Sequence, residues 1–203
     1  MPMDPDISYF AIMQLIRWRF VLIEESGSAG SNLLRAERVA LQVRKIVEEI
    51  AFACLSAVEE RNRQALLNIR TKDADAILAW LERKGLLRLP NAQRIGEPTP
   101  FARMTLEGGA GLAKGLDLDA GTLKAMFSRA SALLHERHPE RLLEAQVIAE
   151  REALESDLQR LRDWLWLHVM FLKSKGFLVQ MGQHGTPSFM TDLTRLSDLP
   201  ANN

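Results

Sequence analysis

The chain has 203 residues, of which 47% are hydrophobic, enough apolar material for a packed core, so a disordered chain is not expected. Its 26 basic and 26 acidic residues cancel, so no overall charge attracts it to nucleic acid or to an anionic membrane surface. The charge is nevertheless uneven along the chain. Residues 61–94 contain eight basic and three acidic residues, and contacts with phosphate groups are most plausible there.

The first predicted helix spans residues 7–25. Asp6 is placed to cap it, and the sequence SGSAGSN ends it. The apolar run in this helix has membrane-like length, but Arg17 and Arg19 interrupt it, and each central arginine costs about 2.5–3.5 kcal/mol on insertion scales. We therefore expect a buried helix and no membrane contact. Because the acidic start MPMDPD does not resemble a secretory signal, we also expect a cytoplasmic location.

Residues 33–60 form the second predicted helix, with Asn32 as its cap. At about 100° per residue, apolar and polar side chains separate onto two halves, which is typical of a central helix in a bundle. The single cysteine, Cys54, lies on the apolar half; it excludes an internal disulfide and a cysteine-based zinc site, and a buried apolar role is expected. The other residues of the apolar half are Val39, Val43, Ile46, Val47 and Ile50.

A third, shorter helix is predicted over residues 73–84, ending at Gly85. Seven glycines and three prolines occur between Gly85 and Gly121. They predict a long irregular insertion at about 86–118, with a short strand at 86–89, and loops of this length are often functional.

The fourth predicted helix covers residues 120–137, with Asp119 as its N-cap, and Pro139 then sets a boundary. Residues 140–175 are predicted to form one helix of about 35 residues, roughly 50 Å long. Apolar residues recur every seven positions along it, which predicts a seam that packs within the bundle or against a second subunit. We therefore expect a homodimer. The seam contains Val147, Leu154, Leu161 and His168.

The C-terminal part changes character. GFLVQM and PSFMTDL flank GQHGT, a pattern that predicts a small β-hairpin at about residues 176–194. Taken together, the elements predict a mainly α single domain over residues 1–203, a helical bundle with long helices, an irregular insertion and a C-terminal hairpin.

An arginine followed after five residues by a histidine occurs twice, as Arg129 with His135 and as Arg162 with His168. In a helical protein this spacing resembles the HEPN superfamily of prokaryotic helical-bundle proteins. The resemblance implies a metal-independent ribonuclease of a toxin or phage-defence type, acting as a dimer on RNA. It further implies that His135 is the acid or base and that Arg129 holds the phosphate. His135 is favoured because it lies near a helix end, whereas His168 lies on the apolar seam.

A second resemblance covers three separated stretches. ALQVRKIVEEIAFACLSAV at 40–58, LLHERHP at 133–139 and the late FLVQMG look like stretches of uncharacterised bacterial proteins of similar length. This resemblance implies a family that spans the whole chain and carries no activity with it. Within the first stretch, Arg44 and Glu48 are an i, i+4 pair, which predicts a surface ion pair.

The alternative function is a non-catalytic interaction or nucleic-acid-binding module. AILAWLERKGLLRL is similar to the end of a winged-helix recognition helix and its following strand, and it lies in the basic 61–94 segment. Arg83, Lys84 and Arg88 would then contact phosphates. His135 and His138 are spaced to share a metal, but no histidine and carboxylate cluster accompanies them. No metal and no small-molecule cofactor is therefore predicted.

Overall fold

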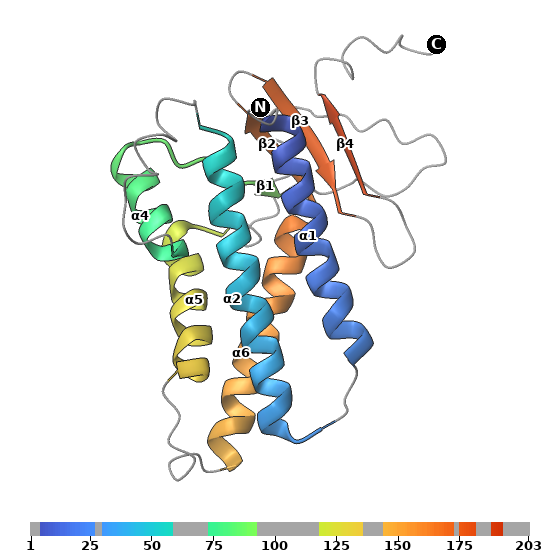
Figure 1. Ribbon diagram of the computed structural model, residues 1–203, viewed down its shortest axis with the longest axis vertical. Coiled ribbons are helices and arrows are strands. Elements are labelled where there is room, and N and C mark those ends of the chain that lie inside the picture. Colours follow the sequence, from blue (N-terminus) through green and yellow to red (C-terminus); the bar gives the residue numbers. More distant parts are fainter. Residues whose placement is uncertain are drawn as a thin grey trace.

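The computed structural model describes part of the 203-residue chain: residues 5–26, 30–58, 73–92, 118–135, 144–172, 175–181 and 188–192. The fold is mainly helical, as predicted, with a small antiparallel sheet at one end of the helical bundle (Figure 1). Its helices are α1 (Pro5–Ser26), α2 (Asn32–Ser56), α4 (Ala74–Arg83), α5 (Ala120–His135) and α6 (Glu144–Leu165). Its strands are β1 (Asn91–Ala92), β2 (Leu167–Leu172), β3 (Lys175–Gln180) and β4 (Phe189–Asp192).

Helix α2 is the centre of the bundle and contacts α1, α4, α5 and α6 (Figure 1). The predicted apolar half is confirmed, since all its residues from Val39 to Cys54 are buried. Burial of such a stripe removes apolar surface from water, and each Å² buried stabilises the fold by about 25 cal/mol. Among the residues of α1 that interrupt its apolar run, Arg19 forms an ion pair with Glu49 of α2 at 2.5 Å. This pair explains how a charged residue is accommodated between the two helices.

The helix boundaries follow local capping. The side chain of Ser31, and not that of Asn32, caps α2 by accepting the amide of Leu34. Asn32 instead accepts a hydrogen bond from Arg151 of α6 at 2.5 Å. The cap prediction was therefore wrong by one residue, because both side chains are suitable acceptors and only one stands in extended backbone.

The start and end of α4 and the start of α5 match the sequence prediction. Asp73 caps α4 by accepting the amide of Ala76 at 2.8 Å, and Asp119 caps α5 in the same way. Gly85 has a φ of +64°, the left-handed conformation that glycine adopts at a helix C-terminus without a steric cost. The predicted second helix is shorter than expected, because α2 ends at Ser56 with Ala57 as its C-cap.

The last predicted helix is wrong over its final ten residues, 166–175. Helix α6 ends at Leu165, and residues 167–172 form β2, which pairs with β3 in register from Leu167 with Gln180 to Leu172 with Lys175. The sequence LHVMFL is rich in residues that favour strands, and pairing with β3 outweighs the heptad pattern that runs through it. The remaining seam residues Val147, Leu154 and Leu161 are buried within this chain's own bundle.

The sheet has the strand order β1-β2-β3-β4, with every neighbouring pair antiparallel. The predicted C-terminal hairpin is confirmed as β3 and β4, with Phe177 opposite Asp192. The predicted strand at 86–89 is wrong; the short strand β1 follows it and pairs with β2. The rest of the predicted insertion, residues 93–117, lies outside the described residues, as does Pro139.

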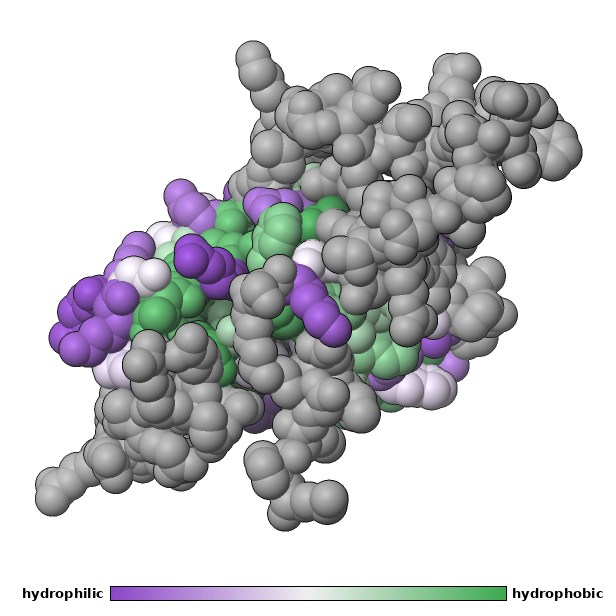
Figure 2. All heavy atoms as spheres, turned by 90° about the horizontal axis from the view of Figure 1, so that it is seen from above, coloured by the Kyte–Doolittle hydropathy of each residue, from purple (hydrophilic) through white to green (hydrophobic). Residues whose placement is uncertain are grey.

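One core joins the helices to the sheet. The main buried cluster includes side chains of every described helix and of β1, β2 and β3. Trp164, fully buried on α6, donates its indole N–H to the carbonyl of Pro90 at 3.1 Å and so fixes the start of the sheet. Seen from above, the surface that is not grey carries hydrophilic residues at its margin and apolar residues between them (Figure 2). No helix within the described ranges is long and apolar enough to cross a membrane.

Candidate functional site

The predicted pair Arg129 and His135 lies on α5, but the two side chains contact different helices. Arg129 Nη1 lies 2.6 Å from Asp157 Oδ2 of α6. His135 Nε2 lies 2.5 Å from Arg44 Nη1 of α2. Six helical residues correspond to a rotation of about 600°, which places the two side chains about 120° apart on α5. The structure therefore brings His135 to an arginine, and that arginine is Arg44.

Arg44 contacts three side chains at once. Besides His135, its Nε donates a hydrogen bond to Glu48 Oε1 at 3.1 Å, and its guanidinium lies 5.3 Å from the centre of the Phe127 ring. Lys45 Nζ binds the other oxygen of Glu48 at 2.7 Å. These five residues, Arg44, Lys45, Glu48, Phe127 and His135, form what we call the α2–α5 cluster.

These contacts determine which groups of the α2–α5 cluster are ionised and which donate hydrogen bonds. Partial burial opposes ionisation of Glu48, but hydrogen bonds from Lys45 and Arg44 and their positive charges outweigh it, so the pKa of Glu48 is lowered from its ordinary value. Arginine carries only donors, so His135 Nε2 accepts the hydrogen bond from Arg44 and has no proton of its own in this geometry. The side chain of His135 is exposed, and its Nε2 is engaged by Arg44.

Arg129 is held in place by a buried carboxylate. The Asp157 side chain is 5% exposed, and that of Arg129 is 45% exposed. Burial raises the pKa of Asp157, and the charge and hydrogen bond of Arg129 act in the opposite direction. The role of Arg129 that this geometry accounts for is compensation of a buried charge that links α5 to α6.

The alternative pair, Arg162 and His168, is separated by the end of α6. Arg162 forms an ion pair with Glu24 of α1 at 2.8 Å and lies over the ring of Phe20. His168 is fully buried in β2, where its Nδ1 donates to the carbonyl of Leu165 and its Nε2 accepts from the hydroxyl of Tyr9 at 2.8 Å. Burial lowers the pKa of His168 to about 4. A side chain so enclosed cannot reach a substrate.

The basic residues proposed for phosphate contacts lie at the end of α4 and in the segment that follows it. Arg83, Lys84 and Arg88 are all exposed. The Nε of Arg83 donates to the carbonyl of Ala79, which leaves its terminal amino groups facing outward. These three exposed cations are compatible with binding a polyanion.

Sequence reasoning did not find Arg44 as the partner of His135. The predicted ion pair of Arg44 with Glu48 is present, but their side chains are only 26% and 17% exposed, and the contact with α5 makes them more than a surface pair. A usable signal existed: two of the three stretches that carry the whole-chain resemblance, 40–58 and 133–139, contain Arg44 and His135.

Other chemistry has little support in the described part of the chain. No group of three histidine, cysteine, aspartate or glutamate side chains there is placed to hold a metal ion. Cys54 is fully buried, as expected, and burial raises the pKa of its thiol to about 12, which makes the reactive thiolate scarce at neutral pH.

No protein-family model matches this sequence, and no curated protein or solved structure matches it either.

Proposed function

We propose that this protein is a HEPN-like, metal-independent endoribonuclease of the toxin or phage-defence type, active in the cytoplasm, with the α2–α5 cluster as its active site. The observation that carries the proposal is the contact of 2.5 Å between Arg44 Nη1 and the exposed His135 Nε2. It joins a cation suited to phosphate with a side chain suited to proton transfer near neutral pH.

Cleavage of RNA without a metal requires one base and one acid. The ribose 2′-hydroxyl oxygen attacks phosphorus as His135 removes its proton, the bond from phosphorus to the 5′-oxygen of the next nucleotide breaks, and that oxygen takes a proton from water as the acid. The products are a 2′,3′-cyclic phosphate end and a 5′-hydroxyl end. Arg44 and Lys45 stabilise the charge that grows on the phosphate oxygens. When the phosphate takes the N–H that Arg44 now gives to His135, Nε2 becomes free to accept the 2′ proton.

Glu48 positions the cations in this proposal. It binds Arg44 and Lys45 through its two oxygens, at 3.1 and 2.7 Å. Its lowered pKa keeps it ionised in the neutral range, so both cations stay anchored from one side. We assign their remaining N–H groups to the phosphate of a substrate bound near His135.

We also propose that the protein is a homodimer. The sequence placed the dimer interface on the seam of the last helix, and we now place it on α1. The seam of α6 is used internally, but α1 exposes Leu15, Trp18 and Leu22 by 53%, 59% and 51%. Their spacing of three and four residues is that of a helix that pairs with a copy of itself. A second copy of this chain is the occupant that we propose for this face.

The test is cleavage of a labelled RNA in excess EDTA by the purified protein and its variants. We expect His135→Ala to lose at least about 100-fold of the rate and Arg44→Gln to lose a similar factor. Arg129→Gln should cleave at nearly the normal rate once folding is verified by circular dichroism, and the exposed Arg83→Gln is the matched control. Full activity of His135→Ala would contradict the proposal.

The second candidate function is nucleic-acid binding by Arg83, Lys84 and Arg88, favoured by their common exposure. The same preparation separates the two candidates. Binding of RNA without cleavage, weakened by salt and by the triple glutamine variant of these residues but not by His135→Ala, would replace the ribonuclease proposal.

A further inference from the structure

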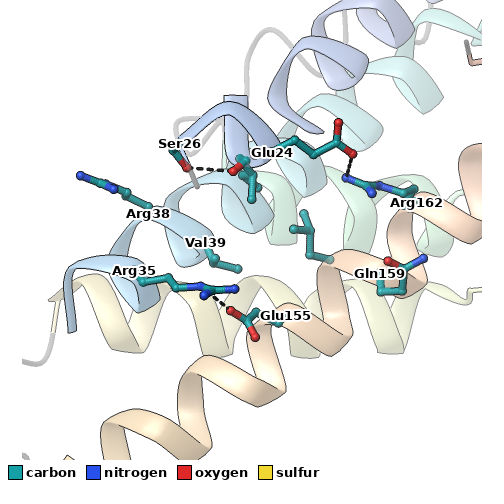
Figure 3. Close-up of a pocket in the computed structure, with 10 residues that line it drawn as sticks. Glu24, Ser26, Arg35, Arg38, Val39, Glu155, Gln159 and Arg162 are labelled. Atoms are coloured by element: carbon teal, nitrogen blue, oxygen red, sulfur yellow. Dashed lines mark hydrogen bonds and ion pairs between the residues drawn. The ribbon is translucent and has the colours of Figure 1, made fainter. Parts of the chain in front are cut away.

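A pocket of about 480 Å³ lies between the last turn of α1, the first turns of α2 and the middle of α6 (Figure 3). Its lining combines three arginines from two helices, Arg35, Arg38 and Arg162, with apolar side chains such as Val39 and Leu158. Binding sites for small molecules commonly have an apolar lining with a few polar groups at fixed positions. The pocket is also large enough for a ligand of the size of a mononucleotide.

Two of the three arginines are held in place by carboxylates at the edges of the pocket. Arg35 Nε lies 2.8 Å from Glu155 Oε1, and Arg162 Nη2 lies 2.8 Å from Glu24 Oε1. In each pair, the two side chains come from different helices and turn toward each other, and Val39 lies between the two pairs (Figure 3). Each guanidinium has five N–H donors, so a single ion pair leaves donors for a second acceptor. Three arginines against two glutamates also give the lining an excess of positive charge.

The start of α2 adds to this positive potential. The hydroxyl of Ser31 caps the amide of Leu34, but no acidic residue occupies the first turn of the helix. The partial positive charge of the helix N-terminus is therefore not neutralised by a carboxylate of that turn. Arg35 follows directly, with its amide bound to the carbonyl of Ser31 at 3.0 Å. An anionic group is favoured at this side of the pocket.

The opposite side of the pocket offers hydrogen-bond acceptors. Glu155 Oε1 is enclosed and lacks a partner with hydrogen-bond geometry, although it is ion-paired with Arg35. Gln159 donates its amide N–H to Asp163 at 2.7 Å, which leaves its carbonyl oxygen as an acceptor. A carboxylate or amide oxygen can accept more than one hydrogen bond. Glu155 and Gln159 can therefore accept N–H groups from a ligand near its apolar part.

We propose that this pocket binds a mononucleotide, with its phosphate on Arg35 and Arg38, its base over Val39 and Leu158, and the N–H groups of the base toward Glu155. A phosphate, a flat apolar ring system and N–H donors in one molecule match the three parts of the lining.

The mononucleotide site is separate from the α2–α5 cluster. Arg35 and Arg44 are nine residues apart on α2, a rotation of about 900°, so they face opposite sides of the helix. This inference therefore goes beyond the proposed ribonuclease activity, and neither result decides the other.

The test is isothermal titration of the purified full chain with the four nucleoside 5′-monophosphates, one at a time, and with inorganic phosphate. We expect at least one nucleotide to bind with a Kd in the micromolar range and phosphate to bind much more weakly. Arg35→Gln and Arg38→Gln should each raise this Kd by about 10-fold, as expected for loss of one charged hydrogen bond. The control is Lys175→Gln, an exposed cation on β3 outside the pocket, which should leave the Kd unchanged.

Glu155→Gln keeps the shape of the side chain and tests the base contact. It should reduce the differences in Kd among the four nucleotides while leaving phosphate affinity unchanged. Melting temperatures of all variants show whether each is folded, and Arg38→Lys provides a milder change at the phosphate. Failure of all four nucleotides to bind at millimolar concentration, equal affinity for phosphate alone, or binding indifferent to both arginine variants would each overturn the proposal.

Discussion

Acid should destabilise the fold through one buried histidine. His168 has a folded-state pKa of about 4, against an ordinary value of 6.5, because burial disfavours its charged form. Between these two values the unfolded chain binds a proton that the folded chain does not. The stability contributed by neutral His168 is therefore fully present above pH 6.5 and is lost as the pH falls toward 4. The difference corresponds to about 3 kcal/mol at most.

The assay is urea unfolding followed by circular dichroism at intervals from pH 7.5 to 4.5, for the wild type and for His168→Gln. Glutamine does not titrate, so the difference between the two pH profiles isolates the histidine. We expect the wild type to lose about 2–3 kcal/mol more than the variant over this range. The variant should start lower at neutral pH, because its side chain replaces the ring that binds Tyr9 and Leu165. Parallel profiles would refute the reasoning.

Three further changes have defined outcomes. Tyr9→Phe removes the hydroxyl that donates to His168 and should lower the free energy of unfolding by about 1–3 kcal/mol, measured by urea titration at pH 7.5; an unchanged midpoint would contradict a structural hydrogen bond. Arg129→Ala leaves the buried carboxylate of Asp157 unpaired and should lower the melting temperature, and adding Asp157→Asn should restore part of it; no rescue would mean that the charge is not the cause. Trp18→Lys places a charge on the exposed face of α1 and should convert a dimer to a monomer in sedimentation equilibrium, with its helix content unchanged; a dimer of unchanged affinity would place the interface elsewhere.

Local signals in the sequence were sufficient for most helices. Asp73, Asp119 and Gly85 mark helix ends through contacts with the nearest turn, so the correct boundaries follow from a few neighbouring residues. The end of α6 depends instead on β3, which supplies hydrogen bonds to residues 167–172. The heptad pattern continues into that stretch, and periodicity alone could not show that strand pairing wins there.

Only His135 of the candidate pair was predicted from the sequence, because its contact with Arg44 depends on the packing of distant segments. His135 stands out because a side chain near a helix end is able to face solvent, and that of His135 is exposed. Its partner Arg44 is 91 residues away in the sequence, and a local spacing rule selects Arg129 instead. The packing of α5 against α2 brings Arg44 to His135. The packing of α5 against α6 brings the buried Asp157 to Arg129.

The most direct test of the central claim is a double-mutant cycle on the rate of RNA cleavage in EDTA, with Arg44→Gln, His135→Ala and the combined variant. Residues that act as one catalytic unit lose little more together than singly. We predict that the combined variant cleaves about as slowly as the slower single variant. Losses that multiply independently, or a normal rate for Arg44→Gln, would contradict a joint role for Arg44 and His135.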